Sequence, residues 1–283
     1  MKSAFVFDPV GFDPAGFDPA GAKDASGKFD LVHVSCVPFL CGADLAAVEK
    51  LRDSLGSSFS GKFPGNTAPD VSGKSGYFRE KREKREKGEK GGPLLLISLP
   101  FISRGKAFDL FKERFAEFAA VFDGFTLQNI GDLEFLSGLL RENGFSQHDF
   151  FLAGDTAFNV FNSGTALFWR GKLDSLAILP ELDPGEQKAL AGRFPEGIVP
   201  EIVSCGVVPV MRSEHCFAVK GRNFKCGACG KYGLAGGSLR DVTGREFRIV
   251  TNPLDCNCVL LGNVNARQPG EDERAVYRTA VFV

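Results

Sequence analysis

The apolar residues of this chain follow two alternating patterns between residues 93 and 210. Short continuous apolar runs, of which 94–99 (LLLISL) is the clearest, are typical of strands buried on both faces of a parallel sheet. Longer segments with apolar residues at helical spacing lie between these runs. The patterns predict strands at 94–99, 124–127, 150–153, 175–179 and 201–205, and helices at 106–122, 132–141, 163–170 and 184–191.

The predicted strands begin about every 25–30 residues, which is the repeat length of βα units in a parallel sheet or barrel. We therefore predict an α/β fold, a partial (β/α)8 TIM-like barrel of about five βα units. One further strand is expected upstream, in residues 29–36, followed by a helix at 43–55. The other opening units are expected to be missing or replaced by low-complexity sequence. A doubly wound sheet is the alternative, disfavoured because no Gly-x-Gly-x-x-Gly turn follows a strand.

The alternation ends after residue 210, where short strand-like runs replace it. Runs at 239–241, 247–251 and 259–261, with a turn at 242–245, predict a small C-terminal β appendage that carries a cysteine cluster. Within the barrel portion, one stripe of phenylalanines at helical spacing is expected to be core rather than a cofactor site: Phe108, Phe111, Phe115, Phe118 and Phe122.

Two low-complexity segments precede the barrel portion. Residues 7–21 repeat FDPVG-FDPAG-FDPAG, which favours successive turns, as an extension or a recognition tail. Residues 79–90 (REKREKREKGEK) have no apolar face and suit a solvated linker or a local RNA contact. The predicted segments are a tail (1–28), a strand–helix segment (29–60), a loop and charged linker (61–92), the barrel portion (93–210) and the Cys-rich appendage (211–283).

The bulk composition narrows the functional classes. Hydrophobic residues make up 43% and charged residues 24%, as in ordinary globular proteins, so a folded core is expected. The net charge of −1 provides no global basic field for nucleic acid, so any such contact would be local. No apolar run reaches the roughly 18–20 residues of a membrane span, and the N-terminus is a poor secretory signal. Eight cysteines without such a signal favour a cytoplasmic location and metal binding over disulfides.

Polar residues gather where the predicted strands end, which is where barrel enzymes place their active sites. We assign candidate catalytic roles to Arg104, Glu181 and His215 and candidate substrate-binding roles to Asn129, Asn159, Asn162, Arg212 and Glu214, with Gln128 in the same ring. Such a ring suits a small molecule that carries carboxylate or amide groups. The alternative for each residue is that it caps a helix or satisfies loop backbone. No nucleophile motif of the Gly-x-Ser-x-Gly, His-Glu-x-x-His or P-loop type is present.

Residues 211–258 hold five of the eight cysteines and one of the three histidines. Cys216, Cys226 and Cys229 form a Cys-x9-Cys-x2-Cys run, and Cys256 follows 27 residues later. Thiolates in this arrangement can converge on one metal site. Zinc ribbons usually pair two Cys-x-x-Cys knuckles, whereas this chain has one, so the spacing favours a [4Fe–4S] cluster over zinc. Zinc and the absence of any metal remain open alternatives.

The strings EIVSCGVVPVMRSEHC and KCGACGKYGLAGGSLRDVTGREFRIVTNPLDCNCVLL resemble the signature region of the collagenase-like peptidases, peptidase family U-32. The similarity covers about residues 93–263, and the upstream VPFLCGADLAAVEKLR looks like the link into a second barrel part. The resemblance implies a full or incomplete (β/α)8 barrel with a [4Fe–4S] cluster. It implies Cys216, Cys226, Cys229 and Cys256 as ligands, with Cys258 outside the motif. Where relatives often have Ser-Pro-Glu-Leu, residues 179–182 read Leu-Pro-Glu-Leu.

The resemblance implies three hypotheses about function. Better-understood members take part in oxygen-independent hydroxylation of tRNA or rRNA bases or of the ubiquinone ring, some using prephenate, so an iron–sulfur enzyme acting on RNA or a related aromatic substrate comes first. A peptidase, as the family name implies, comes second, although no nucleophile motif supports it. An inactive partner subunit with a structural metal site comes third. The expected partners are RNA or a small carboxylate substrate, together with a second chain that covers the sheet edge left by missing strands.

Overall fold

The computed structural model describes residues 2–7, 31–35, 45, 48, 94–102, 105–214, 237–252, 254–264 and 276–282. Its first strands are β1 Lys2–Phe7, β2 Leu31–Ser35, β3 Leu94–Ser98, β4 Gly124–Leu127, β5 Phe151–Gly154 and β6 Ser175–Ala177. They are followed by β7 Val199–Ser213, β8 Gly237–Arg240, β9 Glu246–Asn252, β10 Asn257–Val264 and β11 Val276–Phe282. The α-helices are α4 Gly105–Glu113, α5 Phe115–Val121, α6 Ile130–Glu142, α7 Ser163–Trp169 and α8 Pro184–Ala191.

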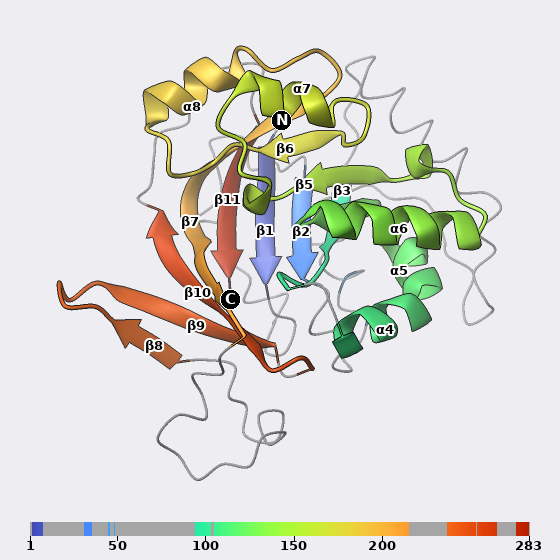
Figure 1. Cartoon of the computed structure of the whole chain (residues 1–283), viewed down its shortest axis with the longest axis horizontal. Coiled ribbons are helices and arrows are strands. Elements are labelled where there is room, and N and C mark those ends of the chain that lie inside the picture. The colour runs from blue at the N-terminus through green and yellow to red at the C-terminus, as the bar shows by residue number, and fades with distance from the viewer. Residues whose placement is uncertain are drawn as a thin grey trace, which may run out of the picture.

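The fold is mixed α/β, and its centre is a curled parallel sheet (Figure 1). Strands β2 to β7 lie side by side in chain order, each parallel to the next. Strand β1 pairs with β2 and with β11, and β11 also pairs with β7, again all parallel. Within the described residues, the backbone pairing therefore runs around eight parallel strands. α-Helices connect β3 to β4 and each following pair up to β7, which is the βα repeat that the sequence predicts.

The ring differs from the predicted partial barrel at its opening strands. The predicted strand at 29–36 is confirmed as β2, but β1 and β11 are not expected from the sequence pattern. Strand β1 lies within the predicted tail and ends at the first residue of the FDPVG repeat, and β11 lies within the predicted appendage. These two strands occupy the sheet edges for which a second chain is expected. Their pairing joins segments far apart in sequence, which local periodicity does not report.

Most predicted elements of the barrel portion are confirmed. Strand β4 and helix α8 have the predicted bounds, and the other strands and helices from β3 to β7 differ mainly at their ends. The predicted helix at 106–122 is divided into α4 and α5 at Arg114. Backbone hydrogen bonds from Arg114 N to Leu110 O and from Phe118 N to Arg114 O cross this division. The predicted helix at 43–55 lies mostly outside the described residues, within which Val48 is buried.

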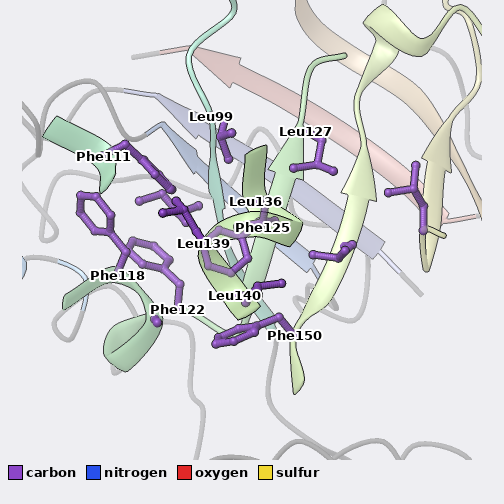
Figure 2. Close-up of a cluster of buried hydrophobic side chains, with 14 of the residues drawn as sticks. Leu99, Phe111, Phe118, Phe122, Phe125, Leu127, Leu136, Leu139, Leu140 and Phe150 are labelled. Atoms are coloured by element: carbon purple, nitrogen blue, oxygen red, sulfur yellow. The ribbon is translucent and has the colours of Figure 1, made fainter. Parts of the chain in front are cut away.

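Outward-facing strand residues and helix residues form the main hydrophobic core. The phenylalanine stripe of α4 and α5 packs on this face of the sheet, and Figure 2 shows Phe111 and Phe118 beside Phe125 of β4. The rings of Phe111 and Phe118 are 5.1 Å apart, and those of Phe125 and Phe150 are also 5.1 Å apart. Phe108 is partly buried and stacks on Phe135 at 4.0 Å. The prediction that the stripe is core is confirmed.

The C-terminal strands β8, β9 and β10 pair antiparallel and form a small β unit, called the appendage below. The cysteine cluster predicted for it stays a prediction, because most of its cysteines lie outside the described residues. Strand β10 also pairs antiparallel with the second half of β7, so β7 belongs to both the ring and the appendage. The predicted turn at 242–245 is confirmed: Gly244 has a φ of +85° and its N–H donates to Asp241 O. Among the described helices, none has the length and apolarity needed to cross a membrane.

We expect the phenylalanine core to contribute strongly to stability. Replacing fully buried Phe118 by alanine should lower the free energy of unfolding by about 3–5 kcal/mol, because it removes apolar contacts and leaves a cavity. The matched control is Phe161→Ala, whose side chain is 59% exposed and which should change stability by about 0.5 kcal/mol or less. Urea denaturation followed by circular dichroism measures both. Equal losses would contradict this account of the core.

Candidate functional site

The interior of the ring changes from apolar to polar toward the carboxyl ends of the strands. The amino-terminal layer is a small cluster in which Leu94, Leu96 and Ala153 are buried. Strand residues alternate between faces, so Ser98 is the next inward position on β3 after Leu96. On the neighbouring strand Thr126 faces inward, as does Gln128, which directly follows β4. All of these side chains are buried. The polar layers lie at the end of the ring where βα barrels place their active sites.

One buried polar network crosses the ring from β2 to β7. His33 Nδ1 lies 2.7 Å from Thr126 Oγ1, and its Nε2 lies 3.4 Å from Glu201 Oε2. The other carboxylate oxygen of Glu201 accepts a 2.6 Å hydrogen bond from Ser175 Oγ. All four side chains are 0% exposed. A buried carboxylate needs hydrogen-bond donors or a positive partner, and here a hydroxyl and an imidazole contact its two oxygens.

A second network lies closer to the strand ends, and Gln128 is at its centre. Gln128 Nε2 donates to Ser98 Oγ at 3.1 Å and to Asp155 Oδ2 at 2.9 Å. Its Oε1 accepts a 3.0 Å hydrogen bond from Arg212 Nη2. The backbone N–H of Gln128 donates to Asp132 Oδ2 at 2.6 Å. The side chain of Gln128, which itself follows β4, therefore joins one residue in or directly after each of β3, β5 and β7.

Arg212 supplies the positive charge of this second network. Its Nη1 donates to Phe101 O at 3.3 Å, and its guanidinium carbon lies 5.3 Å from the centre of the Phe101 ring. Burial lowers the pKa of Arg212, while the negative charges of Asp155 and Asp132 oppose that shift. An arginine remains protonated at physiological pH despite such a shift. The strand-end layer thus combines a partly buried cation with amide and carboxylate groups, which suits recognition of a polar or anionic molecule.

The structure separates the predicted ring of polar residues into different roles. Asn129 caps α6, forming a reciprocal capping box with Asp132. Asn162 caps α7 by accepting a 2.8 Å hydrogen bond from Thr165 N. Helix capping, the alternative considered above, therefore accounts for these two side chains. Asn159 is exposed and has left-handed backbone with a φ of +50°.

Of the remaining predicted residues, only Arg212 has a described contact with the interior networks. Glu181 is exposed between β6 and α8, and Glu214 is exposed just after β7. Arg104 and His215 lie outside the described residues. The structure therefore concentrates the described candidate site on Arg212 and Gln128.

Several interior residues are absent from the predicted site. They share one pattern, a polar residue in or directly after an otherwise apolar buried strand: His33, Ser98, Thr126, Asp155, Ser175 and Glu201. A polar side chain in a strand buried on both faces must face either the helices or the ring interior. Residues an even number of positions apart on a strand share a face. The spacing of each polar residue from the apolar residues that pack on the helices could therefore have shown that it faces the interior.

The turn between β9 and β10 places Cys256 near the strand-end layer. Asp255, in this turn, accepts hydrogen bonds from Lys106 N at 2.9 Å and Ala107 N at 3.2 Å, so it satisfies backbone donors at the start of α4. Figure 1 shows the turn reaching the beginning of α4. In the β10–β7 register, Val259 is opposite Arg212 and Cys258 is opposite Ser213. Cys256 is thus three residues from the partner of Arg212.

The two described cysteines of the appendage have different environments. Cys256 is partly exposed and has a φ of +54°, whereas Cys258 is 0% exposed with its sulfur 3.7 Å from Thr251 Oγ1. The sulfur of Cys258 is thus packed within the hairpin, whereas the Cys256 side chain is partly accessible to solvent. The other predicted ligands, Cys216, Cys226 and Cys229, lie outside the described residues. Within the described residues, no group of three or more His, Cys, Asp or Glu side chains is arranged for a metal.

We expect His33 and Glu201 to depend on each other energetically. Glu201→Leu should lower the free energy of unfolding by about 3–5 kcal/mol, because Ser175 and His33 lose a buried acceptor. The double variant His33→Leu/Glu201→Leu should lose less than the sum of the single variants, with a coupling of about 0.5–3 kcal/mol. Exposed Glu196→Leu is the matched control and should have little effect. Additive losses in urea denaturation would contradict the coupling.

Comparison with known proteins does not assign this chain to a family. No protein-family model matches it, and no curated protein matches it in sequence. Among solved structures, a malate synthase from Haloferax volcanii matches with a TM-score of 0.35 and 13% sequence identity. That match covers 72% of this chain and 62% of the malate synthase chain, so this chain spans less than two thirds of that protein. A TM-score of 0.35 does not establish a shared fold.

Proposed function

We propose that this chain is an iron–sulfur enzyme of the U-32 peptidase type, acting in oxygen-independent hydroxylation or a related modification of RNA or of an aromatic small molecule. The resemblance of residues 201–216 and 225–261 to the U-32 signature is the basis in sequence. The proposed cluster ligands are Cys216, Cys226, Cys229 and Cys256. Zinc is the alternative metal.

One structural observation carries this proposal. Strand β7 has Glu201 inside the ring near its start and Arg212 in the strand-end network near its end. Cys216, Cys226 and Cys229, which lie outside the described residues, follow this strand in sequence, and β10 pairs Val259 with Arg212 only three residues after Cys256. A cluster held by these cysteines would lie beside the polar end of the ring. Redox chemistry and substrate recognition would then share one site.

In this proposal the described residues have different roles. Arg212 binds a polar or anionic part of the substrate, because its guanidinium is only partly buried and has further N–H donors beyond its two described hydrogen bonds. Fully buried Gln128 holds the guanidinium in place through its Oε1. The His33–Glu201 pair lies one layer deeper, with His33 Nε2 3.4 Å from Glu201 Oε2. A bound [4Fe–4S] cluster supplies one-electron chemistry, and ligation by four thiolates favours electron transfer or structure over direct substrate binding.

The peptidase alternative has one observation in its favour. Thr126 Oγ1, His33 and Glu201 form a hydroxyl–imidazole–carboxylate series, with contacts of 2.7 and 3.4 Å. Nucleophilic hydrolases use this connectivity. All three side chains are fully buried inside the ring, however, so a peptide carbonyl has no access to the hydroxyl. Casein digestion that Thr126→Val abolishes, while a Cys256→Ser variant retains it, would favour a peptidase over the iron–sulfur enzyme.

The substrate is tested by comparing cells with and without the gene for this chain. We expect RNA from the deletion strain, or its quinone pool, to lack a hydroxylated species that mass spectrometry detects in the parent. The wild-type gene should restore it, and Arg212→Ala should not, since that variant removes the proposed substrate contact. The control is Arg240→Ala, an exposed arginine on β8, which should restore it fully. Unchanged nucleoside and quinone profiles would contradict the proposal.

The ligand set is tested by a matched pair of cysteine variants. Cys256→Ser should lose most of the iron of the anaerobically purified protein, because serine replaces a proposed ligand. Cys258→Ser should keep it, because Cys258 is buried against Thr251 and stands outside the ligand set. Iron and acid-labile sulfide quantitation measures both. Full iron retention in Cys256→Ser, or in Cys229→Ser, would contradict the assigned ligands.

A further inference from the structure

The appendage is an insertion between two neighbouring strands of the ring. In chain order β7 comes before β8, β9 and β10, and β11 comes after them, while β7 and β11 pair with each other. The appendage therefore follows the carboxyl end of β7, where βα barrels carry the loops of their active sites. An insertion at this point can cover the mouth of the ring.

Contacts of the appendage reach the opposite side of that mouth. Within the described residues, three strands separate β7 from β3 in either direction around the ring, β6, β5 and β4 on one side and β11, β1 and β2 on the other. Even so, Arg212 near the end of β7 donates to Phe101 O, and Asp255 in the β9–β10 turn accepts from the start of α4. Both partners follow β3, so these contacts span the ring.

The polar strand-end layer lies beneath these contacts. Gln128 is 0% exposed, and Ser98 and Asp155 are each 2% exposed. Arg212 is only partly buried and contacts this layer through Gln128, so it lies on the solvent side of the layer. A molecule from solvent therefore reaches the buried amide and carboxylate groups only when the groups above them move.

One exposed contact holds the β9–β10 turn on α4. Asp255 Oδ1 accepts from Lys106 N at 2.9 Å, and Oδ2 accepts from Ala107 N at 3.2 Å. Helix α4 has no acidic residue in its own first turn, so its N-terminal N–H groups receive a carboxylate from 149 residues farther along the chain. A Cβ at Gly105 would lie 2.8 Å from Asp255 Oδ1, so this approach requires a glycine. Because the contact is exposed, it can break and form again without unfolding of the core.

Strand β7 also has a natural bending point between the ring and this turn. The register of β10 on β7 skips Val210, and the pairs on either side of it are Leu261–Pro209 and Leu260–Met211. Such a bulge interrupts the hydrogen-bond ladder and bends the strand. Arg212 lies beyond the bulge, whereas the pairing of β7 with β6 and β11 lies before it. Movement at the bulge therefore shifts Arg212 and leaves the ring in place.

We propose that residues 211–213 and the turn residues 254–256 belong to a lid over the mouth of the ring, which bends at the Val210 bulge and is latched to α4 by Asp255. Opening of the latch admits a molecule to the strand-end layer, and closing excludes water from that layer. The lid goes beyond the proposed function, because it requires neither a metal nor a particular reaction. Loss of the iron–sulfur proposal would leave it intact.

The experiment measures how fast a thiol in the strand-end layer reacts with iodoacetamide. Ser98→Cys introduces the thiol, and mass spectrometry of the peptide that contains position 98 separates it from the native cysteines. Adding Asp255→Ala should raise the rate about fivefold, because the latch is lost. The matched control is Asp183→Ala, which also removes a carboxylate from a helix N-terminus, that of α8, and should leave the rate unchanged.

A second reporter distinguishes lid opening from general loosening. Ala153→Cys introduces a thiol in the amino-terminal layer, at the other end of the ring. Its reaction should stay slow with and without Asp255→Ala, because the lid does not cover that end. Equal rates at position 98 with and without Asp255→Ala, or parallel increases at positions 98 and 153, would overturn the lid.

Salt gives a readout that loss of a helix cap alone would not change. With Asp255 present, the rate at position 98 should rise with ionic strength, because salt screens an exposed carboxylate contact. That dependence should disappear in Asp255→Ala. If Ser98→Cys does not fold, hydrogen exchange of the Gln128 backbone amide, followed by nuclear magnetic resonance, gives the same comparison without a reporter. Exchange at the same rate in the wild type and in Asp255→Ala would overturn the lid.

Discussion

The structure depends on one strand, β7, which pairs in two different ways along its length. Its first part is parallel to β6 and β11 and completes the ring, and its second part is antiparallel to β10 and begins the appendage. A shift of one residue in this register would turn Glu201 away from His33 and Arg212 away from Gln128. The interior networks and the position of the Cys256 turn are therefore set together by the pairing of β7.

Buried charge explains why that register is well defined. The ring interior holds Glu201, and the strand-end layer adds Asp132 and Asp155, all of them buried. Each has specific donors: Ser175 for Glu201, Gln128 for Asp155, and the backbone N–H of Gln128 for Asp132. Carboxylates in such positions are tolerated only while these partners remain in place. The polar interior stabilises one arrangement of the strands and holds Arg212 in the strand-end network.

The sequence predicts the local structure of residues 93–210 well, because that region alternates apolar strands with amphipathic helices. It does not reveal β1 or β11, since their pairing partners are distant in sequence or belong to the far side of the ring. The site shows the same limit. Gln128 and Asn129 are adjacent polar residues at one strand end, yet Gln128 faces the interior and Asn129 caps α6. Sequence spacing cannot distinguish these roles unless it is known which side chains of β4 point into the ring.

For the cysteines, the sequence gives more than the structure does. Their spacing suggests a metal site, whereas the structure describes only Cys256 and Cys258 of the five. What the structure adds is the environment of these two, one partly exposed in a turn at the barrel end and one buried behind it. The central claim is that a redox cluster lies next to the Arg212 network.

The most direct test of that claim is quantitation of iron, acid-labile sulfide and zinc in the anaerobically purified wild-type protein, together with its absorption spectrum. The account predicts about four irons and four sulfides per chain, and a brown protein whose absorbance bleaches on reduction. A colourless protein that holds one zinc and no iron would contradict it.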